Sequence, residues 1–143
     1  MTSLSQLKKE LVASGFEIFR TLPGEVVLAE RVRENLILDS GVRLGIVASG
    51  FCVRVVLGAL RADFPTEPEP MLFERVRRLA EPALASGFAE ISTHVNPIRD
   101  PAYPERILDT SYEVSFTREV ASFSDAVPWL QFALSLQRTV SKA

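Results

Sequence analysis

The chain has 143 residues, of which 47% are hydrophobic and 24% charged, and its formal net charge is −2. This length fits one domain. A domain of this size buries roughly 68–70% of the surface that its unfolded chain exposes, which is enough to fold without a disulfide or a structural metal. The near-neutral charge excludes the broad basic field that drives binding to nucleic-acid phosphates. We therefore expect a single domain over residues 1–143 with no cofactor, and direct nucleic-acid binding is not expected.

The features that bear on the cellular compartment are the N-terminus, the apolar runs and the cysteine. Met1–Leu4 shows no charged region followed by an apolar one, and no apolar stretch reaches the ~18 residues of a membrane span. These patterns predict no signal peptide and no membrane span, and hence a cytoplasmic protein. Cys52 is the single cysteine and stands in the apolar run Phe51–Val53, which indicates a small buried side chain and no disulfide.

The first elements in chain order are a helix and a meander of strands. Ser3 and Gln6 have the spacing of a capping box, and Gly15 is suited to end the helix. On this helix, three residues share one face: Leu4, Leu7 and Leu11. A strand is predicted over Phe16–Leu22. Apolar residues then predict a meander of three or four antiparallel strands over residues 25–61, through Val26–Val32, Leu36–Leu38, Val42–Ala48 and Phe51–Ala59, with turn chemistry at Asp39–Gly41.

The centre of the chain predicts a connector, a helix and a strand. The connector Phe64–Pro70 contains three prolines, which favour a stiff extended conformation. A helix should start at Pro70, be kinked by Pro82 and end at Gly87. It is followed by a strand over Phe88–Val95 and, because of its prolines, a loop over Asn96–Glu105.

The last two elements are a strand and a helix. Ile107–Arg118 alternates cleanly, and the predicted core side comprises Leu108, Thr110, Tyr112, Val114 and Phe116. A helix from about Ser124 to Val140 is apolar over most of its circumference, through Val127, Trp129, Leu130, Phe132, Ala133, Leu134, Leu136 and Val140. A helix that packs one stripe on a sheet needs an apolar arc of little more than 100°. Another element, a ligand or a second subunit should therefore cover the remainder.

The sequence Ala-Ser-Gly-Phe occurs three times, at Ala13–Phe16, Ala48–Phe51 and Ala85–Phe88. The first and third copies each close a predicted helix and open a predicted strand. A ligand loop is one interpretation of this repeat. The favoured interpretation is a pair of glycine helix caps, each followed by a phenylalanine packed in the core.

No pattern of catalytic residues stands out. His94 is the single histidine, too few for a zinc site with Cys52, and no serine stands in a nucleophile-elbow context. Three carboxylates surround the proline-rich loop, Asp100, Glu105 and Asp109, but a solvated loop explains them more simply. The same holds for Arg75, Arg77 and Arg78, which are typical of a solvated helix face. The sequence therefore predicts a protein that is not an enzyme.

The order helix, strand meander, helix, two strands, helix resembles the type III secretion chaperone-like fold, which includes the YbjN group of bacterial proteins. The resemblance covers nearly the whole chain and rests on element order, length and acidic character. The composition, which is rich in Arg, Ala and Val, favours a deinococcal member of the YbjN group. It implies an α+β fold with an antiparallel sheet and helices at the N-terminus, centre and C-terminus. It also implies a homodimer that binds a segment of another protein.

Two other classes stay open at this point. One is a helix-grip-like domain that binds a small ligand, or acts as an enzyme, with a cavity under the C-terminal helix. The other is a roadblock-like regulator of small GTPases, although its strand meander before the central helix is shorter. A dimer in solution favours the chaperone-like and roadblock-like classes, whereas a monomer with a cavity favours the helix-grip-like class.

The candidate partner-binding residues belong to two groups. Trp129, Phe132 and Leu136 represent the apolar surplus of the C-terminal helix, which should contact a second subunit or a partner. Arg99 and Arg106 flank the second proline-rich segment and are suited to attract an acidic partner tail. The segments Phe64–Pro70 and Pro97–Pro104 are expected to form rigid rims of the binding surface, because rigid segments lower the ordering cost of binding.

Overall fold

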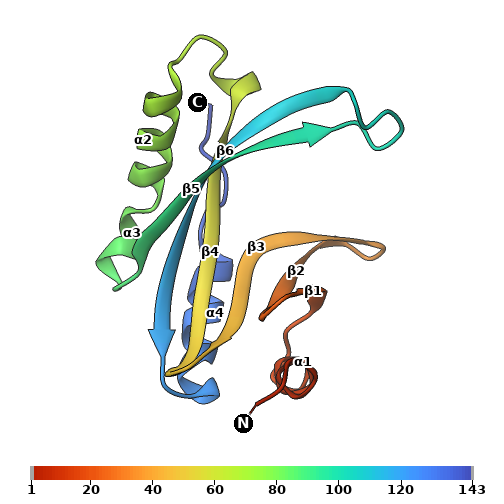
Figure 1. Cartoon of the computed structure of the whole chain (residues 1–143), viewed down its shortest axis with the longest axis vertical. Helices are drawn as coiled ribbons and strands as arrows, with labels where there is room; N and C mark the ends of the chain where they lie inside the picture. Colours follow the sequence, from red (N-terminus) through yellow and green to blue (C-terminus); the bar gives the residue numbers. More distant parts are fainter. Residues whose placement is uncertain (1, 143) are drawn as a thin grey trace. The chain divides into compact units, whose positions relative to one another are not determined.

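The computed structural model of the chain describes residues 2–142. The elements in chain order are α1 (Leu4–Ala13), β1 (Ile18–Leu22), β2 (Glu25–Arg33), β3 (Leu36–Val47), β4 (Gly50–Leu60), the short 3-10 helix η1 (Arg61–Asp63), α2 (Glu69–Leu79), α3 (Glu81–Ala85), β5 (Ala89–Arg99), β6 (Ile107–Val120) and α4 (Phe123–Ser135) (Figure 1). Six strands form one antiparallel sheet in the order β1-β2-β3-β4-β6-β5 within this part of the chain. The predicted α+β class is confirmed, with helices at the N-terminus, the centre and the C-terminus.

The chain forms two compact units. The first comprises the chain up to Val55 together with Thr117–Leu136, and the second comprises Val56–Phe116 together with the chain from Gln137 onward. The strands β4 and β6 therefore contribute residues to both units. The prediction of a single domain stays a prediction.

In the first unit, α1 forms as its sequence indicates and contacts β1 and β2. The Ser3 hydroxyl accepts a hydrogen bond from the Gln6 N–H at 3.1 Å. Leu7 and Leu11 are fully buried. Gly15 has a φ of 93°, which lets the Phe16 N–H donate back to the Leu11 carbonyl at 3.0 Å. Gly87 and Phe88 repeat this arrangement after α3, so the helix-cap interpretation of the Ala-Ser-Gly-Phe repeat is confirmed.

The predicted turn at Asp39–Gly41 is wrong, because β3 runs through it as one strand. The Asp39 carboxylate accepts a hydrogen bond from the Gly41 N–H at 2.7 Å, and the Ser40 hydroxyl donates to the Leu28 carbonyl at 2.7 Å. The pairing of β2 with β3 shifts register at this point. The turn residues therefore produce a β-bulge, which bends a strand without reversing it.

The C-terminal helix is shorter than predicted, since α4 ends at Ser135 and not at Val140. In the first unit α4 packs on β3, with Ala126, Leu130 and Ala133 buried. In the second unit the residues after Gln137 are extended: the Gly58 N–H donates to the Arg138 carbonyl at 3.0 Å, and the Val140 N–H donates to the Gly58 carbonyl at 2.9 Å. These two hydrogen bonds satisfy the backbone N–H and C=O groups of Gly58 on β4. Backbone polar groups of a buried strand need such partners, which explains why the tail is extended here.

In the second unit the predicted kink at Pro82 is a break between α2 and α3, with Pro82 in the first turn of α3. The helix α2 contacts β6 through Phe73 and Tyr112, whose ring centroids lie 5.8 Å apart.

The predicted loop over Asn96–Glu105 is wrong in its first part, because β5 continues to Arg99. Pro97 is tolerated since β5 is the last strand of the sheet, where a missing N–H removes no ladder bond.

The predicted core side of β6 is confirmed at Tyr112, Val114 and Phe116, which are buried. It is wrong at Leu108, whose side chain is 57% exposed. The loop end of the β5–β6 hairpin extends away from α2 (Figure 1), so the alternation continues where α2 does not cover the strand. Periodicity identifies one face of the strand, and the extent of the covering helix decides how far that face is buried.

Candidate functional site

The exposed apolar surface is concentrated on the hairpin formed by β5 and the start of β6, residues 89–108, which we call the β5–β6 arm. Thirteen large hydrophobic side chains are exposed among residues 2–142, and six of them belong to the arm. These six are between 39% and 58% exposed: Ile91, Val95, Ile98, Tyr103, Ile107 and Leu108. Single exposed apolar residues are ordinary, whereas their concentration on one hairpin is typical of an interaction surface.

Both faces of the arm are apolar. The Glu90 carboxylate accepts a hydrogen bond from Arg77 of α2 at 2.8 Å, so Glu90 lies on the face of β5 that is turned toward α2. Side chains alternate along a strand, which places Ile91 and Val95 on the opposite face. Likewise, Leu108 shares the α2-facing side of β6 with Tyr112, and Ile107 lies on the other side.

The outer edge of β5 carries backbone groups that no strand within residues 2–142 pairs with. The Asp100 N–H donates to the Arg106 carbonyl of the returning strand at 2.9 Å. Because hydrogen-bonding directions alternate along an antiparallel strand, Ile91, Thr93 and Val95 direct their N–H and C=O groups outward. The backbone N–H of residue 97 would also be directed outward. The missing N–H of Pro97 therefore leaves the pairing with β6 intact.

This edge has no charged side chain between Glu90 and Arg99, because Ile91–Ile98 contains no Asp, Glu, Lys or Arg. Soluble proteins ordinarily protect long edge strands with charges, bulges or a covering element. Pro97 is the one protective residue in this segment. An edge with so little protection is suited to pair with another strand.

The two predicted arginines lie at the loop end of the arm. The Arg99 guanidinium donates to the Pro104 carbonyl at 3.0 Å. Arg106 lies 3.9 Å from the Asp100 carboxylate and 5.7 Å from the centroid of the Tyr103 ring, and its side chain is 67% exposed. The positive charge of Arg106 therefore lies next to the exposed Tyr103 ring. The contacts with Asp100 and with the Pro104 carbonyl fix the conformation of the loop.

The other predicted group, on α4, is partly covered within the first unit. Trp129, Phe132 and Leu136 are half-buried. The Arg118 guanidinium stacks over the Trp129 ring at 4.0 Å from its centroid, and the Phe132 ring meets Trp129 edge-on at 5.7 Å. Part of the apolar surplus of α4 is thus used inside the unit. These three residues stay candidates for partner contacts, and they belong to a different unit from Arg99 and Arg106.

The arginines of α2 are largely neutralised. Arg75 forms an ion pair with Glu67 at 2.7 Å, and Arg77 pairs with both Glu74 and Glu90. The hydrogen bonds from Arg77 lower the pKa of the Glu90 carboxyl from its ordinary value. This network fits a solvated helix face.

The ion pair of Glu90 predicts a specific pH dependence of stability. A carboxyl whose pKa is lowered on folding contributes stability above its unfolded pKa of 4.5, and the contribution is lost as the pH falls through the lower folded value. We expect Glu90→Gln to cost about 0.5 kcal/mol at pH 7, because the pair is partly exposed, and less at pH 3. Urea unfolding at both pH values measures this difference. Glu105→Gln, which removes an exposed carboxylate from the loop, is the control, and an unchanged gap at pH 3 would contradict the assignment.

The candidate catalytic and metal-ligating residues do not converge. Among the described residues there is no group of three or more His, Cys, Asp and Glu side chains able to hold a metal ion. His94 is exposed on β5. The Asp100 carboxylate accepts a hydrogen bond from the Ala102 N–H at 2.8 Å, and Asp109 accepts one from the Ala62 N–H at 3.0 Å. Asp100 therefore holds the loop of the arm, and Asp109 holds the backbone of η1.

Cys52 is less buried than its apolar neighbours indicate, since its side chain lies on the sheet face opposite Phe51 and Val53 and is half-buried. Burial raises the pKa of its thiol, and the nearby carboxylates of Glu119 and Glu25 raise it further. These surroundings favour the protonated thiol, which is a poor nucleophile.

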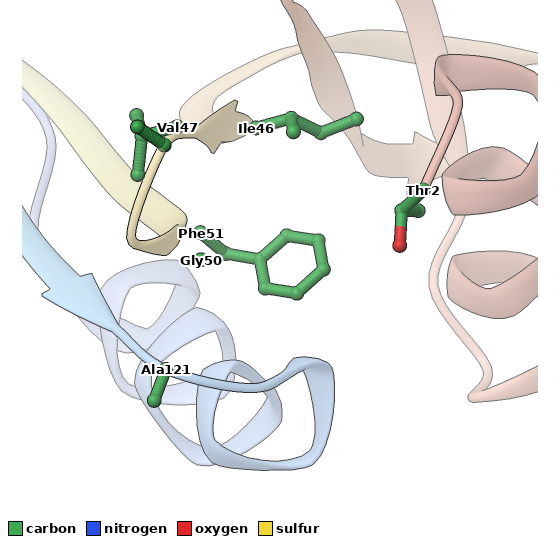
Figure 2. A pocket seen from close by; sticks show the side chains of 7 residues that line it. Thr2, Ile46, Val47, Gly50, Phe51 and Ala121 are labelled. Atoms are coloured by element: carbon green, nitrogen blue, oxygen red, sulfur yellow. The ribbon is translucent and has the colours of Figure 1, made fainter.

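The first unit also contains an open hollow with a volume of about 520 Å³. Its lining residues are Thr2, Ile46, Val47, Ala48, Gly50, Phe51 and Ala121. In Figure 2 the Phe51 ring and the Ile46 side chain extend toward the N-terminal segment that carries Thr2. Ligand sites need placed polar groups to orient the ligand, and Thr2 supplies the single polar side chain of this lining. None of the apolar residues of α4 contributes to it.

Comparison of the chain with protein-family models, with curated proteins and with solved structures finds no match. None of the helices formed by residues 2–142 has the length and apolar character needed to cross a membrane. The resemblance to type III secretion chaperones and to the YbjN group therefore stays a prediction.

The residues of the arm were mostly missed by the sequence patterns. Alternation placed Leu108 in the core and assigned Ile91 and Val95 to a strand, and the prolines placed Ile98 and Tyr103 in a loop. One signal was available: the run Ile91–Ile98 contains no Asp, Glu, Lys or Arg, although longer runs of this kind occur at Leu44–Val53 and Ala126–Gln137. It could mean a strand buried in the sheet or an edge used for pairing, and only the strand order distinguishes the two.

Proposed function

We propose that the protein is a non-enzymatic, homodimeric, cytoplasmic module that resembles type III secretion chaperones and YbjN-like proteins and binds an extended segment of a partner protein. The observation that carries this proposal is the β5–β6 arm, whose apolar side chains are exposed on both faces next to an unpaired strand edge. Such surfaces recognise extended chains through backbone hydrogen bonds and through apolar side chains that enter shallow pockets.

The loop end of the arm is the part suited to the partner segment. Tyr103 and Leu108 supply apolar contact area, and the exposed guanidinium of Arg106 favours acidic residues in the bound segment. The loop is already ordered, because Arg99 and Asp100 hold its backbone through hydrogen bonds. A preformed loop loses little conformational freedom on binding. We therefore expect the preferred segment to combine apolar side chains with acidic ones.

The first proline-rich connector is held in a similar way. The Arg61 guanidinium donates to the Phe64 carbonyl at 3.1 Å, and the Arg75 guanidinium lies 4.3 Å from the centroid of the Phe64 ring. The connector Phe64–Pro70 is thus braced by side chains as well as by its prolines. This supports the prediction that it is a rigid rim, although its exposed apolar area is smaller than that of the arm.

The test is selection of binders from a random dodecapeptide library displayed on phage. We expect enriched peptides to alternate apolar and acidic residues, and the double substitution Tyr103→Ser and Leu108→Ser to weaken binding of a synthetic enriched peptide at least tenfold. Amide chemical-shift mapping with this peptide should show changes at the arm. The matched control is Val12→Ser, which removes an exposed apolar side chain on α1.

Two results would contradict this proposal. One is a selection that returns no sequence preference. The other is a peptide whose shifts are confined to α1 and which binds the arm variant as well as the wild-type protein.

A further inference from the structure

We propose that the outer edge of β5 pairs with β5 of a second copy of this chain, antiparallel about a two-fold axis at Thr93, so that two six-stranded sheets become continuous. This inference rests on the proposed homodimer and names its surface. It separates two roles within the arm: the edge joins the copies, and the loop end binds the partner segment.

The backbone geometry of β5 favours this register. Ile91, Thr93 and Val95 direct their hydrogen-bonding groups outward, as the phase set by Asp100 and Arg106 requires. A two-fold axis at Thr93 places Thr93 opposite its own copy and Ile91 opposite Val95 of the second copy. Each of these pairs exchanges two backbone hydrogen bonds.

Pro97 then falls opposite Ala89 of the second copy, where its carbonyl can still accept a bond. Its missing N–H limits the pairing at this end. The paired segment therefore runs from Ala89 to Pro97 and leaves the loop after Arg99 outside the ladder.

The side chains fit a copy of the same surface. In this register Ile91 and Val95 of the second copy form an apolar cross-strand pair on the face turned away from α2, and such pairs contribute roughly 0.2–1 kcal/mol each. On the other face Glu90 comes opposite Asn96, so no like charges meet. A surface without charge offers no electrostatic preference for a charged partner, and it does not repel itself.

The size of the interface is adequate for a reversible dimer. Pairing of the two edges covers the outward backbone and the exposed parts of Ile91 and Val95. The total buried area is on the order of 1,000 Å², at the lower limit for specific interfaces. We therefore expect dissociation in the micromolar range and a mass that rises with concentration from 15.8 kDa toward twice that value.

A cysteine at the proposed axis tests the register directly. In an antiparallel hydrogen-bonded pair the Cα atoms lie about 5.5 Å apart, within the span of a disulfide. In a Cys52→Ser background, Thr93→Cys should form a covalent dimer under mild oxidation, seen on a non-reducing gel. Glu105→Cys, in the exposed loop outside the ladder, is the control and should stay monomeric on the gel at the same concentration.

A second pair of substitutions tests the edge without relying on a cross-link. Ile91→Lys with Val95→Lys places four positive charges around the axis, and we expect at least a hundredfold weaker dimer by sedimentation velocity with an unchanged far-UV spectrum. The same variant should retain binding of the enriched peptide to the loop end.

The outcomes separate this inference from the proposed function. A wild-type dimer that neither cross-links through Thr93→Cys nor dissociates in the lysine variant overturns the β5 pairing and leaves the homodimer standing. A wild-type mass of one chain at 100 µM or more overturns both the pairing and the homodimer. Loss of peptide binding in an otherwise dimeric, folded Tyr103→Ser and Leu108→Ser variant supports the binding role independently.

Discussion

Replacing Gly50 with alanine is expected to lower the free energy of unfolding by roughly 3–5 kcal/mol, a large part of the 5–15 kcal/mol typical of a domain. Gly50 closes the tight connection between β3 and β4, where it pairs with Val47, and its φ is 142°. A side chain is rarely compatible with this backbone conformation, and the strain costs of order 1–3 kcal/mol.

Crowding adds to this strain. A Cβ atom on Gly50 would collide with the Val120 carbonyl oxygen and would lie 2.8 Å from that of Ala121. Both are backbone atoms, which cannot rotate away as a flexible side chain would, and overpacking of this kind costs about 1–3 kcal/mol more. Urea unfolding followed by circular dichroism measures the loss.

Gly24 provides the matched control for Gly50. Its φ of 77° is also positive, but a Cβ there meets no atom within 4 Å. Gly24→Ala should therefore cost only the conformational strain, about 1 kcal/mol. Equal losses for the two variants would show that the close approach of Val120 and Ala121 does not limit position 50.

The second large effect is expected for Phe116→Ala, which should cost roughly 3–5 kcal/mol, the range measured for buried phenylalanines. Phe116 is fully buried and is the largest side chain of the core that has no exposed surface. Its removal loses the transfer free energy of the ring and leaves a cavity that the surrounding strands cannot close completely. Chemical unfolding at pH 7 gives the value.

Leu108 is the informative comparison for Phe116, because both lie on the same side of β6 and both are core residues by alternation. The structure leaves Leu108 57% exposed, so Leu108→Ala should change the free energy of unfolding by less than about 0.5 kcal/mol. A loss above 2 kcal/mol would mean that Leu108 is buried in solution, for instance by a tightly bound partner or a second copy. A small loss supports the exposed arm on which the proposed function depends.

Local patterns were sufficient for most elements of the fold. The cap at Ser3, the glycine after α1 and the buried pair Leu7 and Leu11 were readable because each depends on residues three to five positions apart. The alternation of β4 and β6 was equally clear. The errors occurred where contacts with distant residues decide the conformation of the backbone. At Asp39–Gly41 a chain reversal was expected, but pairing with β2 keeps these residues in β3 as a bulge.

Local sequence patterns predicted less of the candidate site than of the fold. The arginines Arg99 and Arg106 were identified from their position beside prolines, and the structure places both at the loop end of the arm. Among the apolar residues of the arm, Leu108 was assigned to the core, and Ile91 and Val95 were assigned only to a strand. All three have the same alternation as buried strand residues. Alternation shows which side chains share a face, but it does not show whether anything covers that face.

The sequence alone therefore determined the element types, the α+β class and the charge-free character of the segment Ile91–Ile98. Only the tertiary structure decided that β5 is the last strand of the sheet and that the helix α2 does not cover the whole hairpin. Strand order and helix coverage depend on contacts between residues far apart in the chain, and hydrophobic periodicity carries no information about them. These two features make the same apolar residues a surface for binding instead of a part of the core.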